Sequence, residues 1–414
     1  MKTRQVLIVI AFLLVIGGGY GTYTYLKEKP PHWLIGLLTR TAPPPPLPEG
    51  ETAPLTLPEG FVATIFARDI TGARVMLRDP KGTLLVSETG VGKVVALPDV
   101  NSDGVADKTV TVLEGLRQPH GLSIICADTG NASADQDACM LYVAETGSLK
   151  SYAYDADTMK ASSPTELAQF PAGDGHFTRT LLPAKDNSGL FISIGSSCNV
   201  CNEKNPLRAT VQLFDFATQK LTTYATGLRN TVFMAYDPVT GALWGTDNGR
   251  DVIGEDIPPD EVNIIKQGGN YGWPVCYGAN INDRDFDKNV YIQNPCNGKI
   301  APHIELQAHS APLGLAFIPE EGWPADMRND LLVAYHGSWN RSVPTGYKVV
   351  RFNLDGSRKA SGGPIDFVTG FLAAGAEEDA AIGRPVGLLA EPGGVVYLSD
   401  DRANAIYKIR YAGN

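Results

Sequence analysis

Short runs of apolar and β-branched residues recur along most of this chain, and turns separate them. The recurring unit begins with a small or apolar residue and passes through a turn that contains Asp, Pro or Gly. It continues into a β-rich run that ends on a polar residue, and another strand-like run follows. Six segments have this order: residues 75–97, 121–155, 180–197, 232–249, 314–341 and 387–411. The pattern predicts strands rather than helices.

Six degenerate repeats of four-stranded character predict an all-β fold, a six-bladed β-propeller over residues 55–414. The turns inside the predicted blades are DPKG, KDNSG, DPVTG and EPGG, which are typical tight-turn sequences. A β-sandwich is the alternative, and it explains the strands but not their recurring order. We expect residues 261–269 to form the outgoing strand of the fourth blade. The segment around 266–312 should then be an insertion between the fourth and fifth blades, on the face where a propeller builds its site.

The N-terminus is predicted to be a targeting element. Lys2 and Arg4 precede roughly twenty uncharged, mostly apolar residues that end at Lys27, and this length can span a bilayer. We expect residues 1–27 to be an uncleaved membrane anchor, with a cleaved signal peptide as the alternative. The Pro-rich residues 28–54 should form an extended tether. The rest of the chain would then be exported to the periplasm.

The cysteines fit an exported protein because they are even in number and clustered along the sequence. Pairing between neighbours is our expectation, among the many connectivities that six cysteines allow. The neighbouring pairs are Cys126/Cys139, Cys198/Cys201 and Cys276/Cys296. The CNVC stretch could also be a redox dithiol or half of a zinc site. It lacks a thioredoxin-like context and a second CxxC, so a structural bridge is favoured.

Composition and charge exclude several classes. The chain has 44 Gly and 29 Pro, with 43% hydrophobic and 19% charged residues, which fits a folded, turn-rich domain. Its formal net charge is −10 and no basic run follows the first few residues, which argues against nucleic acid as a partner. The sequence contains no G-x-S-x-G, no P-loop and no H-E-x-x-H, so serine hydrolases, NTPases and zincins lack their motifs.

Histidines and arginines recur at the predicted blade edges. The informative histidines lie beside or near glycine, where an imidazole can enter the axial cavity: His120, His176 and His336. A lone histidine is more often structural, but three at equivalent edges favour at least one base near neutral pH. The arginines at comparable places are Arg229, Arg250, Arg341 and Arg384. Any one of these could be a surface residue, whereas several around one axis would bind a polyanionic small molecule through paired hydrogen bonds.

Two stretches are rich in possible calcium ligands. In DVNSDGVAD, side chains alternate around Gly104 as in the first part of an EF-type loop: Asp99, Asn101, Asp103 and Asp107. Val110 stands where such a loop has its glutamate, so a solvated turn is an equal alternative. In residues 248–261, several carboxylates could hold calcium or solvate a loop: Asp251, Glu255, Asp256, Asp260 and Glu261.

The block TGLRNTVFMAYDPVTGALWGTDNGRD and the following PPDEVNIIKQGGNYGWP, within residues 226–274, resemble the PQQ-dependent sugar dehydrogenases (PQQ, pyrroloquinoline quinone). GHFTRTLL, IGSSCNVCNE, AYHGSWNR and GRPVGL extend the resemblance over essentially all of 55–414, and SSCNVC and HGSWNR are closest to the sorbosone-dehydrogenase-like branch. The resemblance implies a six-bladed propeller that holds PQQ and calcium on one face. PQQ is a tricarboxylate, which would account for the arginines.

The resemblance also implies roles for single residues. His176 would be the general base, taking the proton of the substrate hydroxyl while a hydride passes to the quinone. Arg229 and Asn230 would contact the quinone oxygens. The carbonyls of Gly249 and Arg250 would bind the calcium that acts as a Lewis acid. Further cofactor contacts are implied at His120, Asn248, Arg341 (or Lys348) and Arg384, and a second, structural calcium at Glu261 and the Tyr271 carbonyl.

The sequence therefore predicts a quinoprotein that oxidises an aldose or a related hydroxy-aldehyde. Its electrons would pass to a separate acceptor, a quinone or a cytochrome, because no haem-attachment C-x-x-C-H is present. Where some members have an aspartate before the base this chain has Gly175, so the orientation of His176 must come from elsewhere. A calcium-dependent lactonase-like hydrolase and a non-catalytic binding propeller stay open as alternatives. The hydrolase would need an axial metal held by carboxylate and amide side chains.

Overall fold

The computed structural model describes residues 52–126 and 139–413. These residues belong to the second of two compact units, Pro43–Asn414. The predicted anchor, and the tether except for its last residues, lie outside the described residues and stay predictions. Within the described ranges, no helix is long and apolar enough to cross a membrane.

Six antiparallel sheets form the blades, and each begins with an inner strand. The first blade contains β2 (Ala73–Arg78), β3 (Leu84–Glu88), β4 (Lys93–Leu97) and β5 (Val110–Leu113). The second contains β6 (Gly121–Cys126), β7 (Cys139–Ala144), β8 (Ser148–Asp155) and β9 (Lys160–Gln169). The third contains β10 (Leu181–Pro183), β11 (Gly189–Ile194), β12 (Thr210–Asp215) and β13 (Lys220–Thr226).

The other half of the ring follows the same order. The fourth blade contains β14 (Thr231–Tyr236), β15 (Leu243–Asp247), β16 (Asp260–Ile265) and β20 (Ile304–Leu306). The fifth contains β21 (Pro312–Phe317), β22 (Leu331–Tyr335), β23 (Lys348–Phe352) and β24 (Ile365–Val368). The sixth contains β25 (Pro385–Glu391), β26 (Val395–Asp400), β27 (Ala405–Tyr411) and, from the other end of the chain, β1 (Phe61–Ala67).

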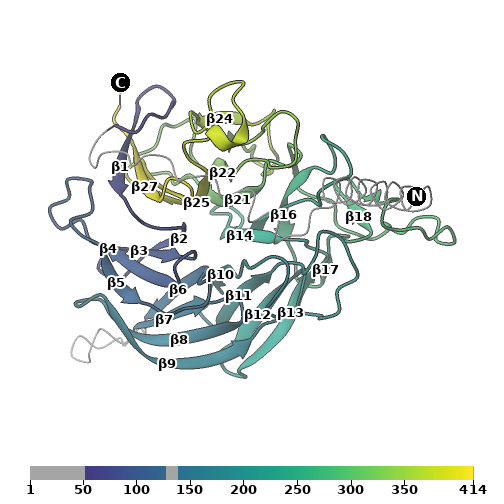
Figure 1. Ribbon diagram of the computed structural model, residues 1–414, viewed down its shortest axis with the longest axis horizontal. Coiled ribbons are helices and arrows are strands. Elements are labelled where there is room, and N and C mark those ends of the chain that lie inside the picture. The colour runs from purple at the N-terminus through teal and green to yellow at the C-terminus, as the bar shows by residue number, and fades with distance from the viewer. Residues whose placement is uncertain (1–51, 127–138, 414) are drawn as a thin grey trace, which may run out of the picture. The chain divides into compact units, whose positions relative to one another are not determined.

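The six inner strands close into a ring. Each contacts the inner strands of both neighbouring blades, in the cyclic order β2, β6, β10, β14, β21, β25 and back to β2. Figure 1 shows these strands around a common centre. The six-bladed propeller predicted from the sequence is confirmed, and the turns DPKG, KDNSG, DPVTG and EPGG each join an inner strand to the next strand of its blade.

One face of the ring, here called the entry face, consists of the starts of the inner strands and the ends of the second strands. The antiparallel register brings these two sets together: Thr231 pairs with Asp247 in the fourth blade, and Pro385 with Asp400 in the sixth. Residues just before an inner strand and just after a second strand therefore meet at this face, whatever their distance in sequence.

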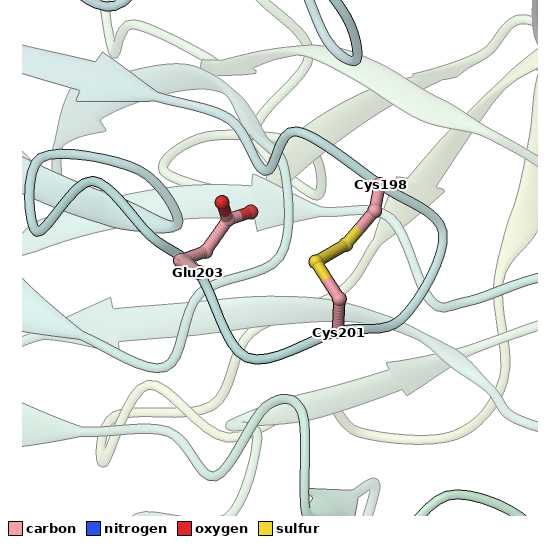
Figure 2. A group of neighbouring side chains, drawn as sticks. All are labelled: Cys198, Cys201 and Glu203. Atoms are coloured by element: carbon pink, nitrogen blue, oxygen red, sulfur yellow. A yellow bond between two sulfur atoms is a disulfide. The ribbon is translucent and has the colours of Figure 1, made fainter.

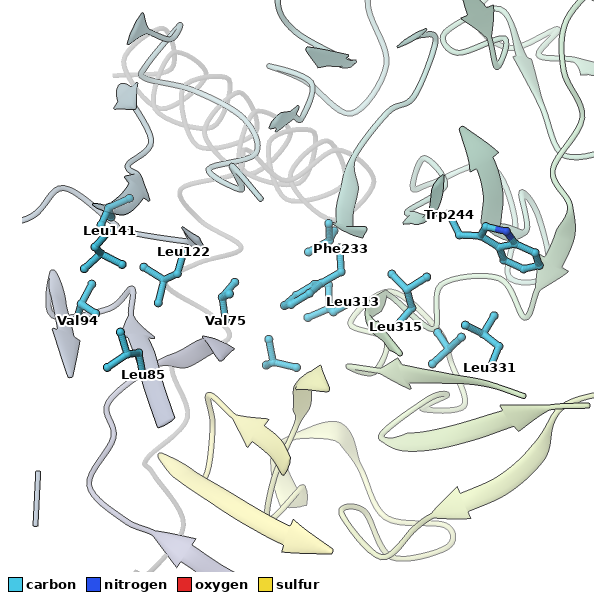
Figure 3. Close-up of a cluster of buried hydrophobic side chains, with 14 of the residues drawn as sticks. Val75, Leu85, Val94, Leu122, Leu141, Phe233, Trp244, Leu313, Leu315 and Leu331 are labelled. Atoms are coloured by element: carbon cyan, nitrogen blue, oxygen red, sulfur yellow. The ribbon is translucent and has the colours of Figure 1, made fainter. Parts of the chain in front are cut away.

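Apolar side chains fill the space between blades. The second strands β11 and β22 are buried throughout, because each lies inside its sheet and its sheet lies between two others. Trp244 of β15 is fully buried and packs edge-on against Phe317 of the fifth blade. Figure 3 shows part of the largest cluster, in which Val75, Leu122, Phe233 and Leu315 come from four different blades. Burying such a side chain contributes roughly 1.5–3 kcal/mol.

The long insertion lies inside the fourth blade, so the prediction that it separates the fourth and fifth blades was wrong. The run predicted to be the outgoing strand is β16, the third strand, and the outer strand β20 pairs with it only after the insertion. Gly268, with φ of +74°, turns the chain away, and β17 (Gly269–Asn270) pairs in parallel with β13 of the third blade. A small hairpin follows, β18 (Cys276–Tyr277) with β19 (Ile281–Asn282).

All three predicted disulfides are confirmed: Cys126–Cys139, Cys198–Cys201 and Cys276–Cys296. The first links β6 to β7, and the third closes the loop that contains the β18–β19 hairpin. Each bridge joins near neighbours and so holds a local loop rather than the ring.

Candidate functional site

Every blade has a basic residue near the start of its inner strand, at the entry face or, for His120, buried beneath it. These residues stand at or just before the starts of the six inner strands: Arg74, His120, His176, Arg229, His309 and Arg384. One contact between the first and third blades brings two of these positions close together. The Arg74 guanidinium of the first blade lies 5.3 Å from the ring centre of Phe177, next to His176 at the start of the third blade.

Ser196, just after β11, sets the orientation of His176. The Nδ1 of His176 lies 3.1 Å from the Ser196 carbonyl oxygen and 3.0 Å from its Oγ. The Ser196 hydroxyl donates its own proton to the carbonyl of Cys198 (2.7 Å), so both oxygens beside Nδ1 are acceptors. Nδ1 therefore carries the proton and the imidazole lone pair is on Nε2. Ser196 supplies the orientation that Gly175 cannot.

Two buried arginines hold the main chain at His176. Arg179 donates hydrogen bonds to the carbonyls of His176 (3.0 Å), Thr178 (2.7 Å) and Pro171 (2.9 Å). Arg208 donates to the carbonyl of His176 as well (3.0 Å). Burial lowers the pKa of Arg179 to about 9, with a smaller contribution from the charge of Arg208. These two guanidinium groups fix the loop that carries His176.

Asn230 and Arg229 lie beside His176. The Oδ1 of Asn230 accepts a hydrogen bond from Thr178 (2.9 Å). Arg229 donates to the carbonyls of Asn199 (2.9 Å) and Asn248 (3.2 Å), and it forms an ion pair with Asp251 (3.3 Å). The structure thus brings the predicted base and the predicted RN pair together.

Gly195 lies directly against His176 and Asn230. The effect of replacing it is our first prediction. A Cβ at Gly195 would lie 2.5 Å from Asn230 Oδ1 and 2.6 Å from His176 Cβ. We expect Gly195→Ala to displace both side chains, lower activity strongly and reduce stability by about 1–3 kcal/mol, as overpacking does. Chemical denaturation and turnover check this. Gly356→Ala is the control, since a Cβ there meets nothing within 4 Å; equal effects of the two changes would contradict the prediction.

A charged network joins the first, fifth and sixth blades. Asp401 accepts from Arg74 Nη1 (2.7 Å) and from His336 Nε2 (2.8 Å). Arg384 donates to the carbonyls of His336 (3.1 Å) and Gly337. Burial, with the nearby charge of Arg384, lowers the pKa of His336 to about 4, so this imidazole is neutral at pH 7. Burial opposes ionisation of Asp401, but its basic neighbours hold its pKa well below the ordinary value.

A second network joins the fourth and fifth blades around Asp251. Its carboxylate accepts from Arg229 and from Asn340 Nδ2 (2.9 Å), and His309 Nδ1 lies 4.0 Å away. His309 Nε2 lies 2.8 Å from the carbonyl of Gly254. Asn340 carries a buried Oδ1 for which the described residues provide no hydrogen-bond partner.

The remaining predicted cofactor residues differ in burial and in their partners. His120 is fully buried beneath the entry face, with Nδ1 3.3 Å from Thr180 Oγ1, so it offers no accessible surface to a ligand. Arg341 is turned toward the loop after β15, where it pairs with Asp256 (2.9 Å), and Lys348 pairs with Asp366 (2.6 Å). Asn248 lies at the entry face with a buried Oδ1 that has no partner among the described groups.

The predicted calcium ligands fall in three places. Gly249 donates its N–H to Asp260 (2.8 Å), and the Arg250 side chain pairs with Asp283 (2.8 Å). Glu261 accepts from Asn263 (2.9 Å) and the Gly278 N–H (3.0 Å), and burial, with the charge of Asp247, raises its pKa to about 8. The Tyr271 hydroxyl donates to the Ile264 carbonyl (2.5 Å).

The DVNSDGVAD loop is bonded largely to itself. The backbone amides of Val100, Gly104 and Val105 donate to Asp107 (2.7 Å), Asp99 (3.1 Å) and Asp103 (2.9 Å), and Asn101 Nδ2 donates to Asp103 (2.9 Å). The Lys408 ammonium lies 3.7 Å from Asp99. This is the pattern of a solvated turn with a local counter-charge, and calcium binding there stays a prediction.

The CNVC stretch is not a metal site in this oxidation state. Across the described residues, one group of three His, Cys, Asp or Glu side chains has its ligand atoms within 4.8 Å of one another: Cys198, Cys201 and Glu203. Figure 2 shows that the two sulfurs are bonded to each other beside the carboxylate. Glu203 accepts from the N–H (2.6 Å) and the hydroxyl (2.7 Å) of Ser197. The bridge thus holds the loop whose Ser196 and Cys198 orient His176.

The family comparison establishes the relationship. A family model described as TrAA12-like matches residues 55–412. This chain belongs to that family. A relative from Borreliella burgdorferi, an uncharacterized protein, is 31% identical over 369 residues, which cover 87% of the TrAA12-like chain and 92% of the relative. The resemblance to the PQQ-dependent sugar dehydrogenases predicted from the sequence is confirmed.

Other relatives and solved structures agree with this. The pyrroloquinoline quinone-dependent pyranose dehydrogenase of Coprinopsis cinerea is 27% identical over 356 residues, covering 74% of this chain and 46% of that protein. The TrAA12-like chain therefore spans about half the length of this relative. The calcium structure of the Trichoderma reesei family AA12 carbohydrate-active enzyme superposes with a TM-score of 0.74 at 22% identity, covering 89% of this chain and 99% of that chain. This likeness shows the fold.

Several residues of the site were not found from the sequence. They are Arg74, Ser196, Arg179, Arg208, Asp401, His309 and Asn340. The signal that could have found Arg74 is its position at the start of an inner strand, within a few residues of the places where Arg229 and Arg384 precede theirs. The others act through hydrogen bonds to main-chain atoms or to distant blades, and no local motif marks them.

Proposed function

We propose that this protein is a PQQ- and calcium-dependent oxidoreductase that oxidises an aldose or a sorbosone-like hydroxy-aldehyde, with Nε2 of His176 as the general base. The fixed tautomer of His176 beside Arg229 and Asn230 carries the proposal. Membership of the family and the pyranose dehydrogenase activity of the Coprinopsis relative support PQQ and a sugar substrate. The calcium structure of the Trichoderma enzyme supports calcium.

The entry face fits a polyanionic cofactor. Three guanidinium groups, of Arg74, Arg229 and Arg384, stand there, and two of them form ion pairs, Arg74 with Asp401 and Arg229 with Asp251. Buried polar atoms without a partner also lie there: Arg74 Nε, Asn248 Oδ1 and Asn340 Oδ1. Buried polar atoms normally have partners, so a ligand with carboxylates and polar ring atoms would satisfy them. When bound, PQQ supplies a quinone that accepts an electron pair.

The protein's own groups supply binding and proton transfer. Nε2 of His176 takes the proton of the substrate hydroxyl, and the hydrogen bonds from Nδ1 to Ser196 stabilise the resulting imidazolium. Arg179 and Arg208 keep the main chain of His176 in place. The carbonyls of Gly249 and Arg250 are our proposed ligands for the cofactor's calcium, and Glu261 with the Tyr271 carbonyl for a second ion. A cation beside Glu261 would offset the repulsion from Asp247.

The alternatives are less well supported. A lactonase-like hydrolase needs an axial metal held by carboxylates and amides, whereas the entry face is rich in guanidinium groups. A non-catalytic propeller gives no reason for a histidine with its tautomer fixed by Ser196.

We also propose that the domain is periplasmic and tethered by residues 1–54 to the inner membrane.

Reconstitution tests the proposal and is our second prediction. The purified full-length chain is titrated with PQQ and calcium, and dye reduction is followed on a panel of aldoses. We expect saturable PQQ binding at micromolar cofactor and sugar-dependent dye reduction that is lost on chelation and restored by calcium. Absence of PQQ binding at that concentration would sink the proposal, and lactone hydrolysis without PQQ would favour the hydrolase.

A further inference from the structure

An axial cavity lies on the other side of the ring from the entry face. It has a volume of about 520 Å³ and is lined by residues of all six inner strands. Its lining runs from Leu122 and Phe233, within these strands, to Pro238 and Pro319, in the turns that follow β14 and β21. The cavity therefore extends toward the face opposite the entry face. Its volume is within the range of small-molecule sites, roughly 300–1,000 Å³.

The lining is mostly apolar, and its polar residues are Arg78, Ser123, Thr180 and Tyr236. Figure 3 shows Val75, Leu122, Phe233 and Leu315, four of its side chains, among the buried apolar residues at the inner strands. The Ser123 side chain belongs to the lining, is 3% exposed, and has an Oγ with no hydrogen-bond partner among the described groups. A buried hydroxyl without a partner is unfavourable, so this cavity suits an apolar ligand that carries an acceptor oxygen.

Packed aromatic rings connect the cavity with the entry face. The ring of Phe177, next to His176, lies 6.2 Å from that of His120, and His120 lies 5.7 Å from Phe233, which lines the cavity. Thr180, beside His120, is part of the lining too. From His120 to Leu122 the chain advances by two residues, about 7 Å at roughly 3.3 Å per residue. A short path of packed rings thus joins the entry face to the cavity.

We propose that this cavity binds a lipid-soluble quinone that accepts the electrons released by sugar oxidation. The inference rests on the proposed function, which requires a separate acceptor. A flat benzoquinone ring with an alkyl tail matches the apolar lining, and one of its carbonyl oxygens accepts a hydrogen bond from Ser123. The sugar loses two electrons and two protons overall. The quinone takes up two electrons through the rings and two protons from solvent and leaves as the quinol.

Binding of ubiquinone-1, a benzoquinone with one isoprenoid unit, tests the cavity without activity. It is titrated by calorimetry into the full-length chain free of PQQ. We expect saturable binding that Ala390→Phe, which fills the lining, weakens at least about tenfold. Ser123→Ala should weaken it about fivefold, as loss of one hydrogen bond does. Ala153→Phe, on the exposed side of β8, is the control and should bind normally.

Turnover separates this proposal from the proposed function. In PQQ-loaded protein with sugar, Ala390→Phe should abolish ubiquinone-1 reduction and leave reduction of ferricyanide, a polar anion, unchanged. If that variant does not fold, Ala235→Phe at another position of the lining replaces it. If PQQ-loaded wild-type protein does not reduce ferricyanide with sugar, the proposed function is refuted. The calorimetric titration then still tests whether the cavity binds the quinone. No saturable quinone binding, or equal binding by the filled variants, overturns the inference.

Discussion

Replacing His176 with Gln should leave PQQ binding intact and lower sugar turnover by a factor of about 10² or more, the scale expected for loss of a general base. The amide of Gln can still donate to the Ser196 carbonyl, which now accepts from Nδ1, but it has no basic lone pair to take a proton. The measurement is kcat with a dye acceptor at saturating sugar, together with PQQ affinity from calorimetry.

His303→Gln is the matched control for this change. His303 packs edge-on against Trp244, and its Nε2 lies 2.6 Å from the Arg358 carbonyl, in the body of the fourth and fifth blades. We expect this variant to turn over sugar at close to the wild-type rate. A His176→Gln protein that keeps turnover within a few-fold of wild type would show that another group is the base.

Asp401→Ala should destabilise the fold by about 3–5 kcal/mol, as removal of one partner from a buried ion pair does. Arg74 would lose its counter-ion and the N–H of His336 would lose its acceptor, and the side chains of Arg74 and His336 are only 10% and 17% exposed. The guanidinium groups of Arg74 and Arg384 would then repel each other without the charge of Asp401 to offset the repulsion. The free energy of unfolding from urea denaturation checks this.

The control for Asp401→Ala is Asp157→Ala. Asp157 pairs with Lys81 at the surface, where the Asp157 side chain is 64% exposed, so solvent screens the pair and little change is expected. PQQ should oppose the destabilisation of the Asp401 variant if the entry face binds it, since a ligand that binds only the folded state stabilises it. If Asp401→Ala lowers the free energy of unfolding no more than Asp157→Ala does, the network around Arg74 contributes little to stability.

Local sequence patterns predicted the blades. They could not predict the position of the insertion, which depends on pairing between strands far apart in the sequence. The turn sequences and the opening residues marked all six inner strands, because each unit repeats the same local chemistry. The place of the insertion was missed, since β16 and β20 are paired strands with the whole insertion between them, and nothing near Ile265 indicates where its partner resumes.

The site residues also differ in this respect, since some are marked by local motifs and others only by contacts between distant segments. His176, Arg229 and Arg384 stood out beside glycine-rich motifs at blade starts. Arg74 was passed over because the first repeat was taken to begin at Val75, one residue later. Asp401 has no motif, and its role exists only because ring closure brings the sixth blade next to the first, where Arg74 stands.

The sixth blade has a consequence for biogenesis. Its outer strand β1 comes from the N-terminal end and pairs with β27, with Phe61 opposite Tyr411. During synthesis, β1 therefore has no partner strand until β27 has been made. The ring cannot close until residues 405–411 have been synthesised, because such non-local pairing must come late. A chain that lacked β27 would therefore leave β1 without a partner strand, as an edge open to other chains.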